Sequence, residues 1–142
     1  MNKPLYTVEI LRLAASIPHL HTLESSDGKA EVRSPTCGSF VRVQVTLDDD
    51  DRVVELGQYV EACAFGQASA ALMGRHAIGC QASHVAKALA EFAAWLDGER
   101  DDPGRWPGLD ALAPARSRRA RHGAMLLAFR ALLAAIEDAQ AK

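Results

Sequence analysis

Apolar residues recur along the chain at two different spacings, and the first of these is helical. Residues 3–16 place apolar side chains on one side of a helical repeat until Pro18 ends the pattern. The inner face predicted for this helix consists of Leu5, Val8, Leu11 and Ala15. A short amphipathic helix is therefore expected before any strand.

Three later stretches show the alternation that is typical of half-buried strands, namely residues 29–34, 40–47 and 52–62. The second alternates most cleanly, and its predicted inner residues are Val41, Val43, Val45 and Leu47. The inner residues predicted for the third are Val54, Leu56, Val60 and Ala62. Because the connections are short, the pattern predicts an antiparallel meander with one face covered by helices.

The pattern becomes helical again after the strands. Helices are predicted for residues 65–74, 82–97 and 120–139. Residues 101–117 are rich in Pro and Gly and are predicted to form a loop around Trp106. An N-terminal helix, a three-stranded meander and a C-terminal group of helices packed on one face of the sheet define an α+β fold. We expect residues 1–142 to form one domain.

The composition agrees with a globular protein, since the 142 residues are 49% hydrophobic and 24% charged, with a net charge of −2. No excess of positive charge favours nucleic acid or a membrane surface as a partner, and no segment is apolar enough to cross a bilayer. Glu9 and Arg12 interrupt the first apolar stretch, which argues against a signal peptide. Three cysteines, an odd number, favour a reducing cytoplasm over a disulfide framework.

Two of the cysteines lie where strand ends are expected to meet. Cys37, in RSPTCGSFVRVQV, precedes the second strand, and Cys63 stands where the third strand changes to a helix. Their separation of 26 residues suits two antiparallel strands and a turn, which would bring both to one edge of the sheet. The first amide groups of a helix would favour the thiolate of Cys63, the form that attacks sulfur and binds metals. The alternative is that both are small buried residues, as free cysteines often are.

The other candidate residues carry weaker signals. An isolated histidine such as His122 is more often structural than a ligand, but an imidazole joins two thiolates naturally in a tetrahedral zinc site. Cys80, between His76 and His84, lacks any recognised metal spacing and is expected to be structural. A basic run near the last helix lacks interleaved aromatic residues and is expected to be a solvated face rather than a nucleic-acid site. Its members are Arg116, Arg118, Arg119 and Arg121.

Three segments together resemble a known family: SPTCGSFVRVQVTLD, VEACAFGQASAALMG and LAPARSRRARHGAML. The first is similar to the PxCGD motif before a strand, and the second to the cysteine-containing turn into a helix, of the IscU/NifU N-terminal-like scaffolds on which iron–sulfur clusters are assembled. The resemblance covers the chain from about residue 5 to its end. It implies the same α+β fold and puts Cys37 and Cys63 at the family's first two ligand positions.

Two family positions are changed in this chain. The aspartate that follows the first ligand cysteine by two residues corresponds to Ser39, and the third ligand cysteine corresponds to Gly123, beside His122. The stretch Leu-Pro-Pro-Val-Lys, which a chaperone recognises in one branch of the family, is only faintly similar to residues 112–116. A three-cysteine site and chaperone handling are therefore not expected in their usual form.

The resemblance implies a scaffold or carrier, not an enzyme, that binds iron or a transient iron–sulfur cluster through Cys37, Cys63 and His122. Its expected partners are a cysteine desulfurase and recipient apoproteins. A two-iron cluster needs about four ligands, so the fourth would come from solvent, a small thiol or another subunit. A homodimer that pools Cys37 and Cys63 from both chains would supply four thiolates.

Two alternatives stay open. In the first, Cys37, Cys63 and His122 hold zinc, and Cys63 accepts persulfide sulfur from a cysteine desulfurase in a sulfurtransferase-like step. In the second, the chain is a degenerate relative that keeps the fold and a partner-binding surface without a metal.

Overall fold

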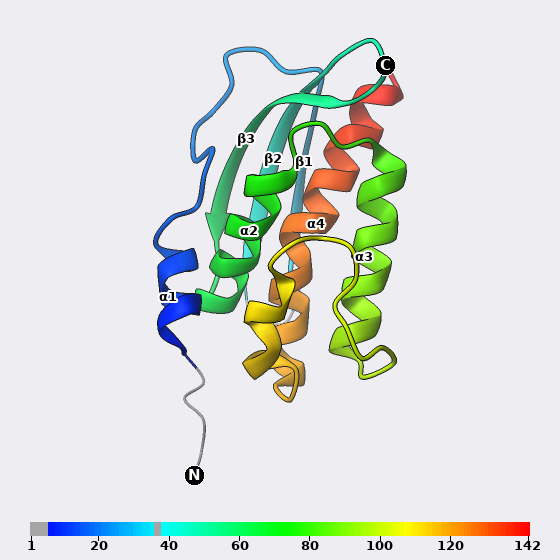
Figure 1. The fold of residues 1–142 in the computed structure, drawn as a ribbon. Coiled ribbons are helices and arrows are strands. Elements are labelled where there is room, and N and C mark those ends of the chain that lie inside the picture. The colour runs from blue at the N-terminus through cyan, green and yellow to red at the C-terminus, as the bar shows by residue number, and fades with distance from the viewer. Residues whose placement is uncertain (1–5, 36–37) are drawn as a thin grey trace.

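The computed structural model describes residues 6–35 and 38–142 of the chain. Its elements, drawn in Figure 1, are α1 (Val8–Ala14), β1 (Gly28–Arg33), β2 (Phe40–Leu47), β3 (Val53–Glu61), α2 (Ala64–His76), α3 (Ala82–Leu96), the 3₁₀ helix η1 (Leu109–Ala115) and α4 (Arg119–Gln140). This order confirms the predicted α+β class. In the part of the chain that the structure describes, no helix is long and apolar enough to span a bilayer.

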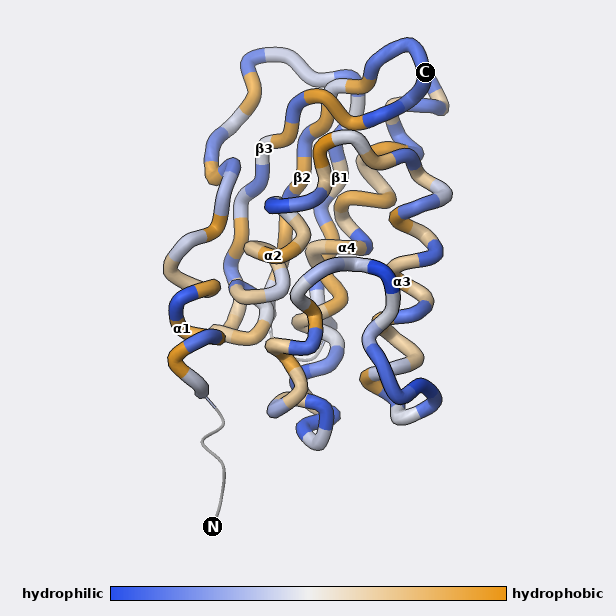
Figure 2. The backbone as a smooth tube through the Cα atoms, viewed as in Figure 1, coloured by the Kyte–Doolittle hydropathy of each residue, from blue (hydrophilic) through white to orange (hydrophobic). Residues whose placement is uncertain are grey.

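The strands form one antiparallel sheet in the order β1-β2-β3, and helices cover one of its faces. Figure 1 shows α2 and α4 against that face, with α3 packed beside α4. The inner residues of β2, Val41, Val43 and Val45, are fully buried, as the alternation predicts. Figure 2 shows the hydrophobic residues along the strands and the hydrophilic ones at the β2–β3 turn.

Strand β3 departs from the predicted pattern near its start. Thr46 pairs with Glu55 whereas Leu47 pairs with Val53, so the register shifts between these two pairs. Val54 is left as the extra residue of a bulge, and it is 45% exposed while Val53 is buried in its place. The prediction that Val54 faces the core is wrong, and the bulge is the reason.

Helix α1 is shorter than predicted and turns a different face inward. Ile10 and Leu13 are its buried residues, whereas Val8 and Leu11 are 64% and 50% exposed. Ala15 is exposed as well. The sequence carries two apolar stripes around this helix, and packing against α2 selects the stripe that contains Ile10 and Leu13.

The segment predicted to be a loop around Trp106 is partly helical and belongs to the core. Its second half forms η1, and Trp106 is only 1% exposed. The indole Nε1 donates a 2.9 Å hydrogen bond to the carbonyl of Leu72, and the ring packs edge-on against Phe129 with centroids 5.1 Å apart. Leu109, Leu112 and Ala115 of η1, spaced three residues apart, are buried as well, so they and Trp106 together hold this segment in the core.

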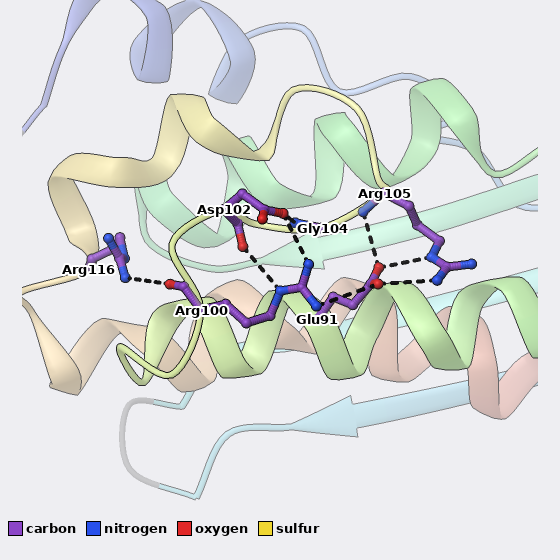
Figure 3. Close-up of polar contacts among 6 residues, drawn as sticks. All are labelled: Glu91, Arg100, Asp102, Gly104, Arg105 and Arg116. Carbon is purple, nitrogen blue, oxygen red and sulfur yellow. Dashed lines mark hydrogen bonds and ion pairs between the residues drawn. The ribbon is translucent and has the colours of Figure 1, made fainter.

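Charged side chains fix the connection between α3 and η1 (Figure 3). Arg105 donates to the two carboxylate oxygens of Glu91 at 2.9 and 3.1 Å, and its backbone amide donates to the same carboxylate at 3.1 Å. Arg100 lies 3.7 Å from Glu91 and pairs with Asp102 at 3.1 Å. The hydrogen bonds from the side chain and then the backbone of Arg105 lower the pKa of Glu91 to about 2. Glu91 therefore anchors this connection as an anion.

Replacing Glu91 by Gln is expected to lower the melting temperature at neutral pH, because the connection loses its anionic anchor. A carboxyl group whose pKa is lowered by folding stabilises the folded state above its ordinary pKa of 4.5, and this contribution is lost as the pH falls toward about 2. Thermal melts should therefore show the full difference from wild type at neutral pH and a shrinking one between these two values. Glu99→Gln, at an exposed position in the same connection, is the matched control. A difference that is independent of pH would contradict the prediction.

Gly28, at the start of β1, sets how closely the sheet approaches α4. A Cβ atom there would collide with the carbonyl oxygen of Ala135 and lie 2.6 Å from the amide nitrogen of Ala139. We expect Gly28→Ala to lower the free energy of unfolding by about 1–3 kcal/mol, the range measured for overpacked cores. Urea denaturation measures this loss, and an unchanged unfolding midpoint would contradict it.

Candidate functional site

A pocket of about 270 Å³ lies at the edge of the sheet where four segments meet. These segments are the loop before β2, the end of β3, the start of α2 and the start of α4. The wall consists of Gly38, Ser39, Glu61, Ala62, Cys63, Ala120, Arg121 and Ala124. Cys63, one of the three predicted ligands, thus lines this pocket.

Cys63 stands immediately before the first turn of α2. Its backbone is extended, and its carbonyl accepts a 2.9 Å hydrogen bond from the amide of Gln67 as the helix begins. Within the described residues its thiol makes no capping hydrogen bond. The residue is half-buried, so the sulfur lies at the rim of the protein rather than deep in its core.

Gly66 lets α4 approach α2 next to Cys63. A Cβ atom at Gly66 would lie 2.7 Å from the Cβ of Ala62 and 3.1 Å from the carbonyl oxygen of Ala124. Only a residue without a side chain keeps this contact. The first turn of α4, which includes Arg121, is thereby held as the opposite wall of the pocket.

The loop that carries Cys37 reaches the pocket through the residues that follow it. Gly38 and Ser39 line the wall, and the amide of Ser34 donates a 2.8 Å hydrogen bond to the carbonyl of Ser39. Cys37 itself lies outside the described residues, so its role as a ligand stays a prediction. The antiparallel pairing of β2 and β3 brings this loop and Cys63 to one edge.

His122 is buried near the start of α4, with 9% of its surface exposed, and it is not part of the pocket wall. Its Nε2 lies 2.8 Å from the carbonyl oxygen of Arg116. Because a carbonyl only accepts, Nε2 donates the proton, and the lone pair of the neutral ring is left on Nδ1. Ligating histidines commonly have their second nitrogen held in this way. The role of His122 as a third ligand stays a prediction.

A complete metal site is not formed by the described residues alone. Among residues 6–35 and 38–142, no group of three or more His, Cys, Asp or Glu side chains is placed to hold a metal ion. A metal or cluster bound through Cys63 therefore needs Cys37 or a ligand from outside the chain to complete a set of three. This requirement applies to zinc as well as to iron.

Cys80 occupies a different part of the molecule, as a structural residue would. Its thiol donates a 3.2 Å hydrogen bond to the carbonyl of His76, and burial raises the pKa of the Cys80 thiol. The rings of His76 and His84 pack against Trp106, with centroids 6.4 and 5.8 Å from it. These contacts agree with the structural role expected from the sequence.

The arginines of the basic run before and within α4 lie in different environments. Arg116 is not simply solvated, because it donates to the carbonyls of Trp95 and Arg100 at 3.0 and 3.2 Å and stacks over the Trp95 ring at 4.8 Å. Arg121 lines the pocket, opposite the strand end that supplies Glu61. The sequence analysis placed Arg121 on a solvated face and did not single out Glu61. In the sequence, the one indication of a role for these two residues is that Arg121 adjoins His122 and Glu61 lies two residues before Cys63.

The fold and the pocket define a small α+β protein with a cysteine-bearing rim at the edge of an antiparallel sheet. Residues 5–97 match the family model described as the NifU-like N terminal domain. The chain belongs to this family, which confirms the resemblance seen in its motifs.

Solved structures agree with this assignment. The N-terminal part of a nitrogen-fixing NifU-like protein from Brucella abortus is 32% identical, with a TM-score of 0.90 over 97% of this chain and 96% of the other. A proposed iron–sulfur cluster assembly scaffold protein for the SUF system of Fervidobacterium islandicum AW-1 is 19% identical, with a TM-score of 0.84 over 93% of this chain and 96% of the other. The second likeness shows the fold alone. No curated protein matches the chain in sequence.

Gly123, which the resemblance assigns to the family's third cysteine position, has room for a side chain among the described residues. Among residues 6–35 and 38–142, a Cβ atom there would meet only the Oγ of Ser34, at an ordinary 3.8 Å. Because glycine inside a helix is less favourable than alanine, we expect Gly123→Ala to raise the free energy of unfolding by about 0.5–1 kcal/mol. Urea denaturation alongside Gly28→Ala tests the contrast, and a loss of stability for Gly123→Ala would contradict this geometry.

Proposed function

We propose that this protein is a scaffold or carrier on which an iron–sulfur cluster is assembled and held as cargo. The observation that carries the proposal is the pocket shared by Cys63 and the residues that follow Cys37. Membership of the NifU-like N-terminal family supports it. So does the fold shared with the Fervidobacterium protein described as a proposed cluster assembly scaffold.

The proposed ligands are Cys37 and Cys63, because cysteine thiolates are the usual ligands of iron–sulfur clusters. Two thiolates from one chain leave about two positions to be filled. His122, a small thiol or the cysteines of a second copy are the candidates for those positions. A half-buried sulfur on an open rim suits cargo that has to enter and leave.

The proposed role is not enzymatic, and it requires other proteins. A cysteine desulfurase is the proposed source of sulfur, with Cys63 able to receive it as a persulfide. Apoproteins that need a cluster are the proposed recipients. We place this activity in a reducing cytoplasm, where free thiols persist.

Anaerobic reconstitution with ferrous iron and sulfide tests the proposal. The wild-type protein is expected to develop visible charge-transfer absorption and to retain iron and sulfide after gel filtration. Cys37→Ser and Cys63→Ser should each remove most of that absorption, because each deletes a thiolate ligand. Cys80→Ser is the matched control and should load as wild type does, since its thiol is held by the carbonyl of His76.

Three results would contradict the scaffold proposal. One is a wild-type protein that takes up no iron or sulfide, and another is loading that survives loss of both Cys37 and Cys63. The third is about one zinc and no sulfide per chain in protein purified without air or chelators, which would favour the zinc alternative.

His122→Gln separates a ligand from a structural histidine. The glutamine amide can keep donating to the carbonyl of Arg116 but offers no ring nitrogen. Replacement of a ligating imidazole should change the reduction potential and the visible spectrum of the loaded protein. Unchanged spectra would remove His122 from the proposed ligand set.

A further inference from the structure

A second pocket, of about 380 Å³, lies at the end of β3 that is opposite to Cys63. The residue before β3, the α2–α3 connection, the first turns of α3 and the connection after α3 form its wall. Figure 1 shows the β2–β3 turn and the α2–α3 connection at the same end of the molecule. We call this hollow the α3 pocket. The nine residues of β3 separate it from Cys63, so it is distinct from the proposed cluster site.

Positive charge dominates the wall of the α3 pocket. Arg52, Lys87 and Arg105 line it together with His84, whereas no Asp or Glu among the described residues does so. The three cationic residues come from three separate segments of the chain. A concave surface lined by one sign of charge concentrates ligands of the opposite sign. The wall therefore favours an anion.

Two interactions place the guanidinium of Arg52 at this wall. Its Nη1 donates a 3.2 Å hydrogen bond to the carbonyl of Gly79, which lines the pocket. Burial raises the pKa of the neighbouring Cys80 thiol, and the positive charge of Arg52 opposes that shift. Among the described residues Arg52 has no carboxylate partner, so its other N–H groups are left to donate to a ligand.

Hydrogen bonds hold the α2–α3 connection against the start of β3. The amide of Val53 donates to the carbonyl of Cys80 at 3.0 Å, and the amide of Gly79 donates to the carbonyl of Val53 at 2.7 Å. The side chain of Gln81 donates to the carbonyl of Asp50 at 2.7 Å. The wall is thus formed before any ligand arrives, which reduces the entropy lost on binding.

The acidic groups nearest to the pocket are already engaged. The carboxylate of Asp48 accepts from the amides of Asp50 and Arg52, inside the β2–β3 turn. Glu91 accepts two hydrogen bonds from the side chain of Arg105. Lys87 makes no hydrogen bond or ion pair with any described residue. Arg52 and Lys87 are therefore the two cations of this wall that lack an acidic partner within the described chain.

The first turn of α3 adds hydrogen-bond donors to the same wall. It has no acidic residue, and Gln81 gives it no side-chain cap, so its first amides keep their partial positive charge. An open helix N-terminus alone does not define a site, but this one lies among cationic side chains and beside the hydroxyl of Ser83. Amides, a hydroxyl, an ammonium and a guanidinium together are the donors that bind phosphate oxygens.

The size of the α3 pocket indicates a ligand larger than a bare phosphate ion. Its volume falls within the ~300–1,000 Å³ that is usual for small organic ligands. Ile78, which is 47% exposed, and the ring of His84 line the same wall and offer a surface to an organic group. A carboxylate carries one charge, whereas a phosphate monoester carries about two near neutral pH and matches the two unpaired cations.

We infer that the α3 pocket binds a small phosphate monoester. Arg52, Lys87 and the first amides of α3 hold the phosphate group, and the organic group lies against Ile78 and His84. This inference goes beyond the proposed function, because none of these residues belongs to the proposed ligand set of the cluster.

Calorimetric titration of the metal-free protein with adenosine monophosphate tests the inference. The nucleotide should bind and inorganic phosphate should compete with it, whereas adenosine, which lacks the phosphate, should not bind. Acetate at the same concentration should not displace the nucleotide. Arg52→Gln and Lys87→Gln are each expected to weaken binding about tenfold, the effect of one charge-assisted hydrogen bond. Arg130→Gln, at an exposed position of α4 outside this pocket, is the matched control and should bind as wild type does.

Thermal melts of the variants check that each one folds. If Arg52→Gln fails to fold, Lys87→Gln still decides the question, because Lys87 has no partner among the described residues to lose. A wild-type protein that does not bind the nucleotide would overturn the inference, as would equal affinity for adenosine or an unchanged affinity in Lys87→Gln. An equal loss in Arg130→Gln would also overturn it, since attraction to the overall charge would then explain the binding. No iron or sulfide is present, so failure of this test leaves the scaffold proposal standing, and failed cluster loading leaves this inference standing.

Discussion

The close contact of α4 with both the sheet and α2 is the constraint on which the rest of this structure depends. Gly28 lies against the backbone of α4 near Ala135, and Gly66 lies against the same helix at Ala124. Two glycines thus fix one helix at both ends, because any side chain there would meet backbone atoms. This contact places the first turn of α4, with Arg121, across the pocket from the end of β3.

The two helices that begin at the Cys63 pocket lack stabilising groups at their first turns. α2 and α4 both begin there without an acidic residue in the first turn or a side-chain cap, and Gly123 follows in the helix interior. In the α3–η1 connection, by contrast, Glu91 accepts two hydrogen bonds from the side chain of Arg105. Helix α3, which begins away from the Cys63 pocket, lacks an acidic first turn and a side-chain cap among the described residues as well, so these features do not by themselves mark a binding site.

Much of the fold could be predicted from local pattern. Val41, Val43 and Val45 alternate without interruption, so β2 and its inner face follow from the sequence. Val54 could not be placed, because a bulge is set by pairing with the neighbouring strand. Nor could Trp106, which is buried by a partner on α2 and another on α4 rather than by any periodicity of its own.

The sequence by itself determined that Cys63 and the loop before β2 lie at the same edge of the sheet. Two antiparallel strands joined by a short turn bring the chain back to the edge at which the first strand began. Only the tertiary structure decided what faces them. Arg121 lines the pocket across from the end of β3, because helix packing sets the distance between segments far apart in the chain. His122 turns to the carbonyl of Arg116 instead of entering the pocket wall. Local periodicity carries no information about such distances.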